Sequence, residues 1–85
     1  MRKDLEMDNL NERVIKTLLQ IKKSAENHLD SKKLVTDGIL DSLDIMRLIM
    51  ELEFKFDIAI DPADVLSDNF ESVDAMVALV EKCKK

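Results

Sequence analysis

The residues best suited to chemistry are an aspartate and a serine, Asp41 and Ser42, which follow the only glycine of the chain, Gly38. A strongly helical run over residues 45–56 comes directly after them, so both polar residues lie where a loop becomes a helix. Their side-chain oxygens can accept hydrogen bonds from the free N–H groups of the first helical turn. A serine hydroxyl at this position is also suited to carry a phosphodiester, because the helix dipole and the free amides stabilise negative charge.

The sequence specifies no other chemistry. It contains no paired nucleophile and base, no cluster of metal ligands and no glycine-rich phosphate loop. The lone histidine, His28, is expected at the surface near the end of the first helix. The lone cysteine, Cys83, is expected to be a packing or surface residue rather than a reactive thiol. We therefore predict a protein that is not an enzyme, with neither a catalytic residue nor a metal site.

The composition is that of one small helical domain. The chain has 85 residues, with one Gly, one Pro, no Trp and no Tyr, so helix breakers are few. A single cysteine excludes an intrachain disulfide and fits a reducing cytoplasm. The first residues lack the apolar run of a signal peptide, and no segment reaches the length of a membrane span. We expect one domain over residues 1–85, cytoplasmic, monomeric and not inserted in a membrane.

Charge is divided unevenly along the chain. Residues 1–36 carry eight basic and six acidic side chains, a net charge of +2, whereas residues 37–85 carry five basic and twelve acidic ones, a net charge of −7. Such an acidic surface repels nucleic acid and attracts basic partner surfaces. A solvated face that only keeps the protein in solution is the simpler interpretation of the same pattern. Nucleic-acid binding is not expected under either interpretation.

The spacing of apolar residues predicts an all-α fold, a small four-helix bundle with three long helices, one short third helix and a long loop between helices one and two. The expected elements are a first helix from between Asp4 and Asn9 to about Asn27, a loop over residues 27–40, a second helix over Ser42–Phe56, a short third helix from Pro62 to about Leu66, and a last helix starting near Ser72. Gly38 is expected to supply a turn conformation that other residues disfavour.

The second helix carries two apolar stripes where folding needs only one. Its core face comprises Ile45, Leu48, Ile49, Leu52 and Phe56; the second stripe comprises Leu43, Met46, Met50 and Phe54. For Met46 and Phe54 two alternatives stay open: cover by another part of the bundle, or exposure. Leu43 and Met50, which Asp44, Arg47 and Glu51 border, predict a docking surface, because the flexible thioether of methionine adapts to several partners.

Residues 38–56 resemble the attachment site of the acyl carrier and peptidyl carrier proteins. Asp41-Ser42-Leu43 matches the motif of that family, and residues 51–57 resemble the end of its second helix. Residues 58–62 resemble its link to the short third helix, and residues 69–75 the start of its last helix. The resemblance covers nearly the whole chain, although the N-terminal segment matches only in length and helical pattern.

The resemblance implies a non-catalytic carrier that holds its cargo as a thioester on a 4′-phosphopantetheine arm. Ser42 would be the attachment point, Asp41 would cap the helix and orient the turn, and Leu43 would complete the motif. The docking face would comprise Leu43, Asp44, Arg47, Met50 and Glu51. The implied partners are a phosphopantetheinyl transferase, acyl- or aminoacyl-loading (adenylating) enzymes, synthases and acyltransferases of fatty-acid or secondary-metabolite biosynthesis. The sequence does not identify the cargo.

Two positions depart from the pattern of fatty-acid carriers. Ile39 stands where those carriers usually have glycine, and Arg47 stands at a site that is usually acidic. Gly-Ile-Leu-Asp-Ser looks more like the D-alanyl and aminoacyl carriers, which favours a specialised stand-alone carrier. The alternative function is a non-catalytic helical interaction module in which Ser42 is only a helix cap.

Overall fold

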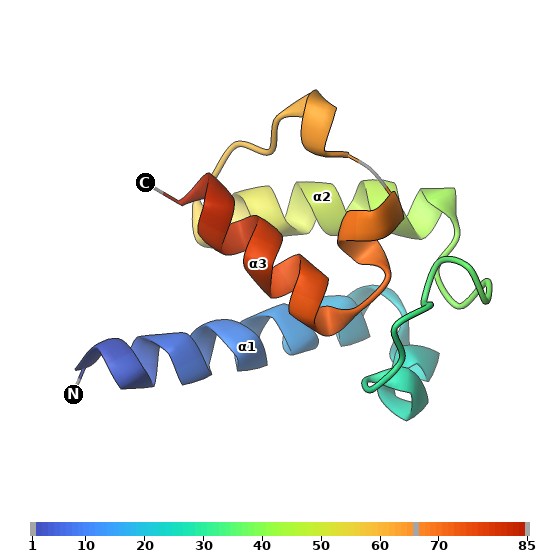
Figure 1. The fold of residues 1–85 in the computed structure, drawn as a ribbon, viewed down its shortest axis with the longest axis horizontal. Coiled ribbons are helices and arrows are strands. Elements are labelled where there is room, and N and C mark those ends of the chain that lie inside the picture. The colour runs from blue at the N-terminus through green and yellow to red at the C-terminus, as the bar shows by residue number, and fades with distance from the viewer. Residues whose placement is uncertain (1, 66, 85) are drawn as a thin grey trace.

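The computed structural model describes residues 2–65 and 67–84, and the side chains from Leu10 onward within these ranges. The described elements are α1 (Arg2–Ile21), the 3₁₀ helix η1 (Lys23–His28), α2 (Ser42–Phe56), the 3₁₀ helices η2 (Pro62–Asp64) and η3 (Ser67–Phe70), and α3 (Val73–Cys83). The chain reverses direction between α1 and α2, and α1 packs against both α2 and α3 (Figure 1). The prediction of an all-α fold with three long helices is confirmed.

The predicted helix boundaries hold for α2 and α3 but not for the other helices. α1 already begins at Arg2, and it ends at Ile21 instead of continuing to Asn27, because Lys22 adopts an extended conformation. The apolar pattern did not reveal this break, because Ala25 follows Ile21 at helical spacing. In the structure Ala25 is buried but belongs to the separate 3₁₀ helix η1. The short third helix is a single 3₁₀ turn, η2, and its predicted end, Leu66, lies outside the described residues.

One apolar core lies between the three long helices. α2 turns Leu48, Leu52 and Phe56 into this core, which confirms the predicted core face, while Ile45 and Ile49 are half-buried at its edge. The remaining buried apolar side chains are Leu10, Val14, Leu18, Ala25, Leu34, Leu40, Ile60, Phe70, Val73, Met76, Leu79 and Val80. The long loop therefore contributes to the core, which keeps an extended connection compact.

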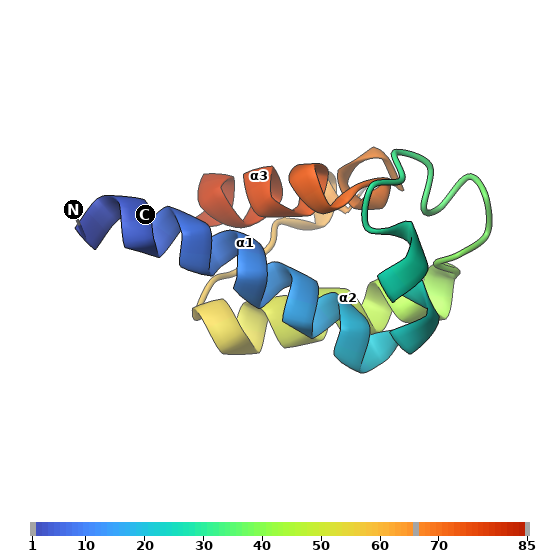
Figure 2. The ribbon, with the colours of Figure 1, turned by 90° about the horizontal axis from the view of Figure 1, so that it is seen from below.

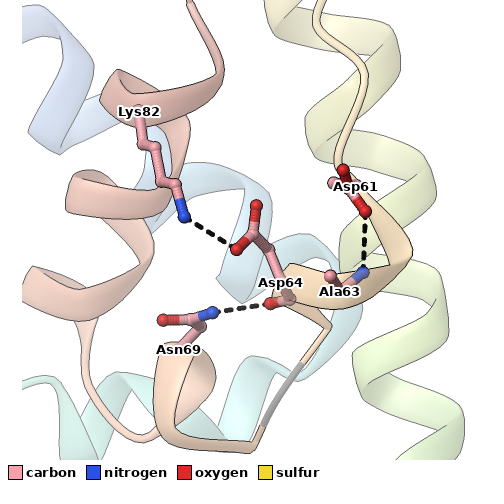
Figure 3. Close-up of polar contacts among 5 residues, drawn as sticks. All are labelled: Asp61, Ala63, Asp64, Asn69 and Lys82. Carbon is pink, nitrogen blue, oxygen red and sulfur yellow. Dashed lines mark hydrogen bonds and ion pairs between the residues drawn. The ribbon is translucent and has the colours of Figure 1, made fainter.

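The connection between α2 and α3 is held by polar side-chain contacts (Figure 3). Asp61 caps η2 by accepting a hydrogen bond from the backbone N–H of Ala63 at 2.8 Å. The side-chain amide of Asn69 donates to the carbonyl oxygen of Asp64 at 2.6 Å, and Lys82 Nζ lies 2.7 Å from Asp64 Oδ1. That hydrogen bond raises the pKa of Lys82. Asp64 therefore ties the connection to the last turns of α3.

We expect Leu52→Ala to lower the free energy of unfolding by about 2–5 kcal/mol, because Leu52 is fully buried and the substitution leaves a cavity. Phe54→Ala is the matched control on the same helix: Phe54 is 83% exposed, and its removal should change stability by less than about 0.5 kcal/mol. Urea unfolding of both variants measures the difference. Equal effects would contradict the assignment of the two faces of α2.

Candidate functional site

The turn that precedes α2 is closed by two reciprocal hydrogen bonds. Asp41 is the N-cap residue, and its Oδ1 accepts from the backbone N–H of Asp44 at 2.9 Å. In return, Asp44 Oδ2 accepts from the backbone N–H of Asp41 at 3.0 Å. This arrangement is a capping box, which satisfies two N–H groups that a helix start leaves without intrahelical partners. Ser42 therefore occupies the first helical position and is not the cap.

Because Asp41 caps the helix, the Ser42 hydroxyl is not used for capping. The Ser42 side chain is exposed, and its hydroxyl forms no hydrogen bond with any residue that the structure describes. Within the same described part, the backbone N–H groups of Ser42 and Leu43 also have no acceptor. The site thus offers an exposed oxygen beside two amides at the positive end of the α2 dipole, an arrangement that stabilises a phosphate ester.

Asp44 links the start of α2 to the end of α1. Its carboxylate Oδ2 lies 3.1 Å from Lys22 Nζ, and Lys22 is the extended residue that ends α1. Burial raises the pKa of the Asp44 carboxyl. The hydrogen bond from the Asp41 N–H and the Lys22 ammonium lower it, and together they outweigh burial, so the pKa lies below its ordinary value. The end of α1, η1 and the start of α2 lie together at one end of the molecule in both views (Figures 1 and 2).

The structure corrects the predicted position of Asp44. We expected this residue at the border of an open docking surface, but it is only 7% exposed. The capping box turns its carboxylate back toward the Asp41 N–H, and Lys22 covers it from the side of α1. Asp44 therefore supports the turn through intramolecular contacts.

A second support of the turn comes from Glu71, just before α3. Its carboxylate accepts hydrogen bonds from the backbone N–H of Val35 at 2.9 Å and of Thr36 at 3.0 Å, and also from the Thr36 hydroxyl. The hydrogen bonds from Thr36 lower the pKa of Glu71. Sequence reasoning did not identify Glu71, because nothing local signals a contact between residues so far apart in the chain. Gly38, with a φ of 79°, then completes the predicted turn toward Asp41.

The second apolar stripe of α2 is open along its whole length. We call Leu43, Met46, Met50 and Phe54 the apolar row; their exposed fractions are 57%, 59%, 66% and 83%. Of the two alternatives for Met46 and Phe54, cover by another segment or exposure, the structure shows exposure. The row begins at Leu43, directly after Ser42, and Arg47 and Glu51 lie beside it, exposed and half-buried respectively. Exposed apolar strips of this kind are typical of interaction surfaces, and the predicted docking face stays a prediction.

A groove between α1 and α2 runs beside the apolar row. Its lining residues are Gln20, Ile21, Arg47, Met50, Glu51 and Lys55, and its volume is about 700 Å³. Lys55 Nζ donates a hydrogen bond to Gln20 Oε1 across this groove. Gln20 and Lys55 were not among the predicted site residues, because their proximity arises only when α1 packs against α2.

Comparison with known proteins gives one match. A family described as "Phosphopantetheine attachment site" matches residues 13–80, a range that contains the Asp41–Asp44 turn and all of α2. No curated protein and no solved structure matches the chain. The part of the chain described by the structure has no group of His, Cys, Asp or Glu side chains able to hold a metal ion. None of its helices is long and apolar enough to cross a membrane.

We expect Asp44→Ala to lower the free energy of unfolding by about 0.5–2 kcal/mol near neutral pH, because it removes one half of the capping box. The folded state lowers the pKa of Asp44, so the carboxylate stabilises the protein above the ordinary pKa of 3.8 and loses this effect as the pH falls through the lowered value. The difference between wild type and variant should therefore shrink in acid.

Thermal or urea unfolding between neutral pH and the acid range measures this effect. Asp37→Ala is the matched control, because Asp37 is an exposed acid of the preceding loop whose side chain has no hydrogen-bond partner among the described residues. A stability difference for Asp44→Ala that is absent at neutral pH, or that grows in acid, would count against the capping role.

Proposed function

The chain belongs to the phosphopantetheine attachment site family of carrier domains, and on this premise we propose that it carries acyl or aminoacyl groups on an arm attached to Ser42. Members of the family are not catalysts: they bear 4′-phosphopantetheine on a serine and interact with a phosphopantetheinyl transferase and with loading enzymes. The choice of Ser42 and the class of cargo are the parts that we add as proposals.

The observation that carries the assignment to Ser42 is that the N-cap role is taken by Asp41. The alternative, in which Ser42 is only a helix cap, loses support because the Asp41 carboxylate already accepts from the Asp44 N–H. A serine at the first helical position, with its hydroxyl exposed, has no structural task that explains it. An attachment role does explain it, and the family match spans the same turn.

The residues around the turn fit the group that Ser42 would carry. In the proposed transferase reaction, the Ser42 Oγ–H proton would pass to the transferase, an Oγ–P bond would form, and the pyrophosphate bond of coenzyme A would break with departure of adenosine 3′,5′-bisphosphate. Asp41 and Asp44 hold the turn in place, and the N–H groups of Ser42 and Leu43 would stabilise negative charge added there. When bound, the arm supplies a terminal thiol that holds the cargo as a thioester, so Cys83 has no part in the chemistry.

We further propose a specialised carrier whose partners read the open face of α2. Ile39 and Arg47 support this choice, since both depart from the fatty-acid pattern and Arg47 is exposed beside the apolar row. Leu43, Met50 and Glu51 complete the proposed contact surface. The same proposal includes loading by an adenylating enzyme and delivery to a synthase or acyltransferase. It also includes a cytoplasmic location, which a single cysteine fits.

Incubation with a broad-specificity phosphopantetheinyl transferase, magnesium and coenzyme A should add the mass of one phosphopantetheinyl group to the wild-type protein. Ser42→Ala should abolish this addition and leave stability nearly unchanged, because the hydroxyl makes no contact that the fold needs. Intact-mass spectrometry gives the first result, and urea unfolding gives the second.

Ser72→Ala is the matched control, because Ser72 is the N-cap of α3 and its Oγ accepts from the Ala75 N–H at 3.0 Å. That variant should lose about 1 kcal/mol of stability and still be modified. Wild-type protein that stays unmodified, or Ser42→Ala protein that gains the group, would overturn the assignment and leave the interaction module as the better interpretation.

A further inference from the structure

We propose that the open face of α2 binds partner surfaces in which carboxylates flank an apolar groove. The inference rests on the proposed function, since it names the chemistry of the proteins that read this carrier. It follows from three features of the face: its exposed apolar side chains, the sign of the charges that remain free on it, and the groove beside it.

The apolar row is too exposed to be explained by the core. Phe54 is 83% exposed and Met50 66%, and both lie on the side of α2 opposite the buried Leu48 and Leu52. Each large apolar side chain contributes roughly 1.5–3 kcal/mol when it passes from water into a fully buried site. Four such side chains, spaced along one helix face, therefore form a ready contact strip for an apolar groove on a partner.

The acidic residues of α2 are mostly withdrawn from this face. Asp44 is engaged by the Asp41 N–H and by Lys22, as described above. Glu53 accepts a hydrogen bond from the backbone N–H of Ile60 at 2.9 Å, which directs its carboxylate toward the connection that follows α2. Among the residues that line the groove, Glu51 is the one acidic residue.

The basic residues of α2, Arg47 and Lys55, line the groove between α1 and α2. Arg47 is exposed, and its guanidinium forms no ion pair within the described ranges. Lys55 donates to the neutral side-chain amide of Gln20, so its charge is not neutralised by a carboxylate. Arg47, Glu51 and Lys55 follow one another at steps of four along the groove and give it a net charge of +1, in a chain whose net charge is −5.

Screening by salt decides whether a partner experiences the local charge of the groove or the net charge of the whole chain. At physiological ionic strength the Debye length is about 8 Å, so exposed charges farther away contribute little to a contact. Arg47 and Lys55 border the groove itself, whereas most of the acidic surplus lies on other elements. A partner that docks on α2 therefore meets a weakly basic, apolar surface, for which carboxylates around an apolar groove are the complement.

The groove between α1 and α2 strengthens this choice. Ile21 and Met50 provide apolar lining, and the two cations, Arg47 and Lys55, also border it. An apolar side chain with neighbouring carboxylates would fill the groove and satisfy both cations together. A lysine-rich surface would instead bring like charges together at both positions, which is unfavourable.

Two synthetic amphipathic helical peptides test the proposal. They share one leucine and phenylalanine stripe; glutamates flank it in the first peptide and lysines in the second. In about 0.15 M salt, we expect the glutamate peptide to bind unmodified wild-type protein about fivefold more tightly, as two exposed ion pairs predict. Nuclear magnetic resonance shifts should centre on Arg47, Met50 and Lys55.

Charge-reversed variants sharpen the test. Combined Arg47→Glu and Lys55→Glu should invert the preference between the peptides. The matched control, Lys32→Glu with Lys84→Glu, makes the same change in net charge at exposed sites away from the groove, and it should preserve the wild-type preference. Phe54→Ser should weaken binding of the glutamate peptide and leave the fold intact, because Phe54 is exposed.

The proposal is overturned by preference for the lysine peptide, by shifts located elsewhere, or by absence of binding. It is also overturned if sedimentation equilibrium shows a dimer that Phe54→Ser disrupts, because a second copy would then cover the apolar row. Peptide binding is read without modification of Ser42, and the mass-spectrometric test is run on the same variants. The two experiments are therefore independent. A failed peptide test does not contradict attachment at Ser42, and a failed attachment test does not change what peptide binding shows about the α2 face.

Discussion

The reciprocal hydrogen bonds between Asp41 and Asp44 are the constraint on which the rest of the site depends. They determine the residue at which α2 begins, and a helix that began one residue later would change the place of Ser42 in the first turn. Because Asp41 is the cap, Ser42 enters the helix at its first position with an unused hydroxyl. Because Asp44 closes the box, its carboxylate also faces Lys22 and connects α2 to the end of α1. One local motif thus places both the exposed Ser42 hydroxyl and the helix that follows it.

α2 has to serve two environments at once. Its inner face contributes Leu48, Leu52 and Phe56 to the core, and its outer face keeps four large apolar side chains in water. Eighty-five residues bury only a modest core, so an exposed row of this size is a substantial departure from the pattern that folding alone requires. The surplus of acidic residues elsewhere in the chain offsets the reduced solubility of this face, since a net charge of −5 opposes association between copies.

The loop before α2 shows how a long connection can present a residue in a defined place. Leu34 and Leu40 are buried, and the backbone N–H of Leu34 donates to the Glu71 carbonyl at 2.9 Å. The Glu71 carboxylate holds the next two residues of the loop as well. A carrier needs its attachment residue exposed but the surrounding surface reproducible, because each partner must find the same contacts. Burial of the loop's apolar side chains, together with the Glu71 hydrogen bonds, provides that reproducibility.

The sequence by itself determined the features that depend on neighbours along the chain. Helical periodicity identified α2 and its two stripes, the Asp41-Ser42-Leu43 motif located the turn, and Gly38 marked its positive-φ position, because caps, turns and amphipathic faces are properties of short segments. The motifs in their order also indicated the carrier family, which matches residues 13–80. Tertiary structure alone decided the burial of Asp44, the Glu71 contacts with the loop and the exposure of Met46 and Phe54. Each of these depends on which distant element packs nearby, and a pattern along one helix shows that a face is apolar but not whether another segment covers it.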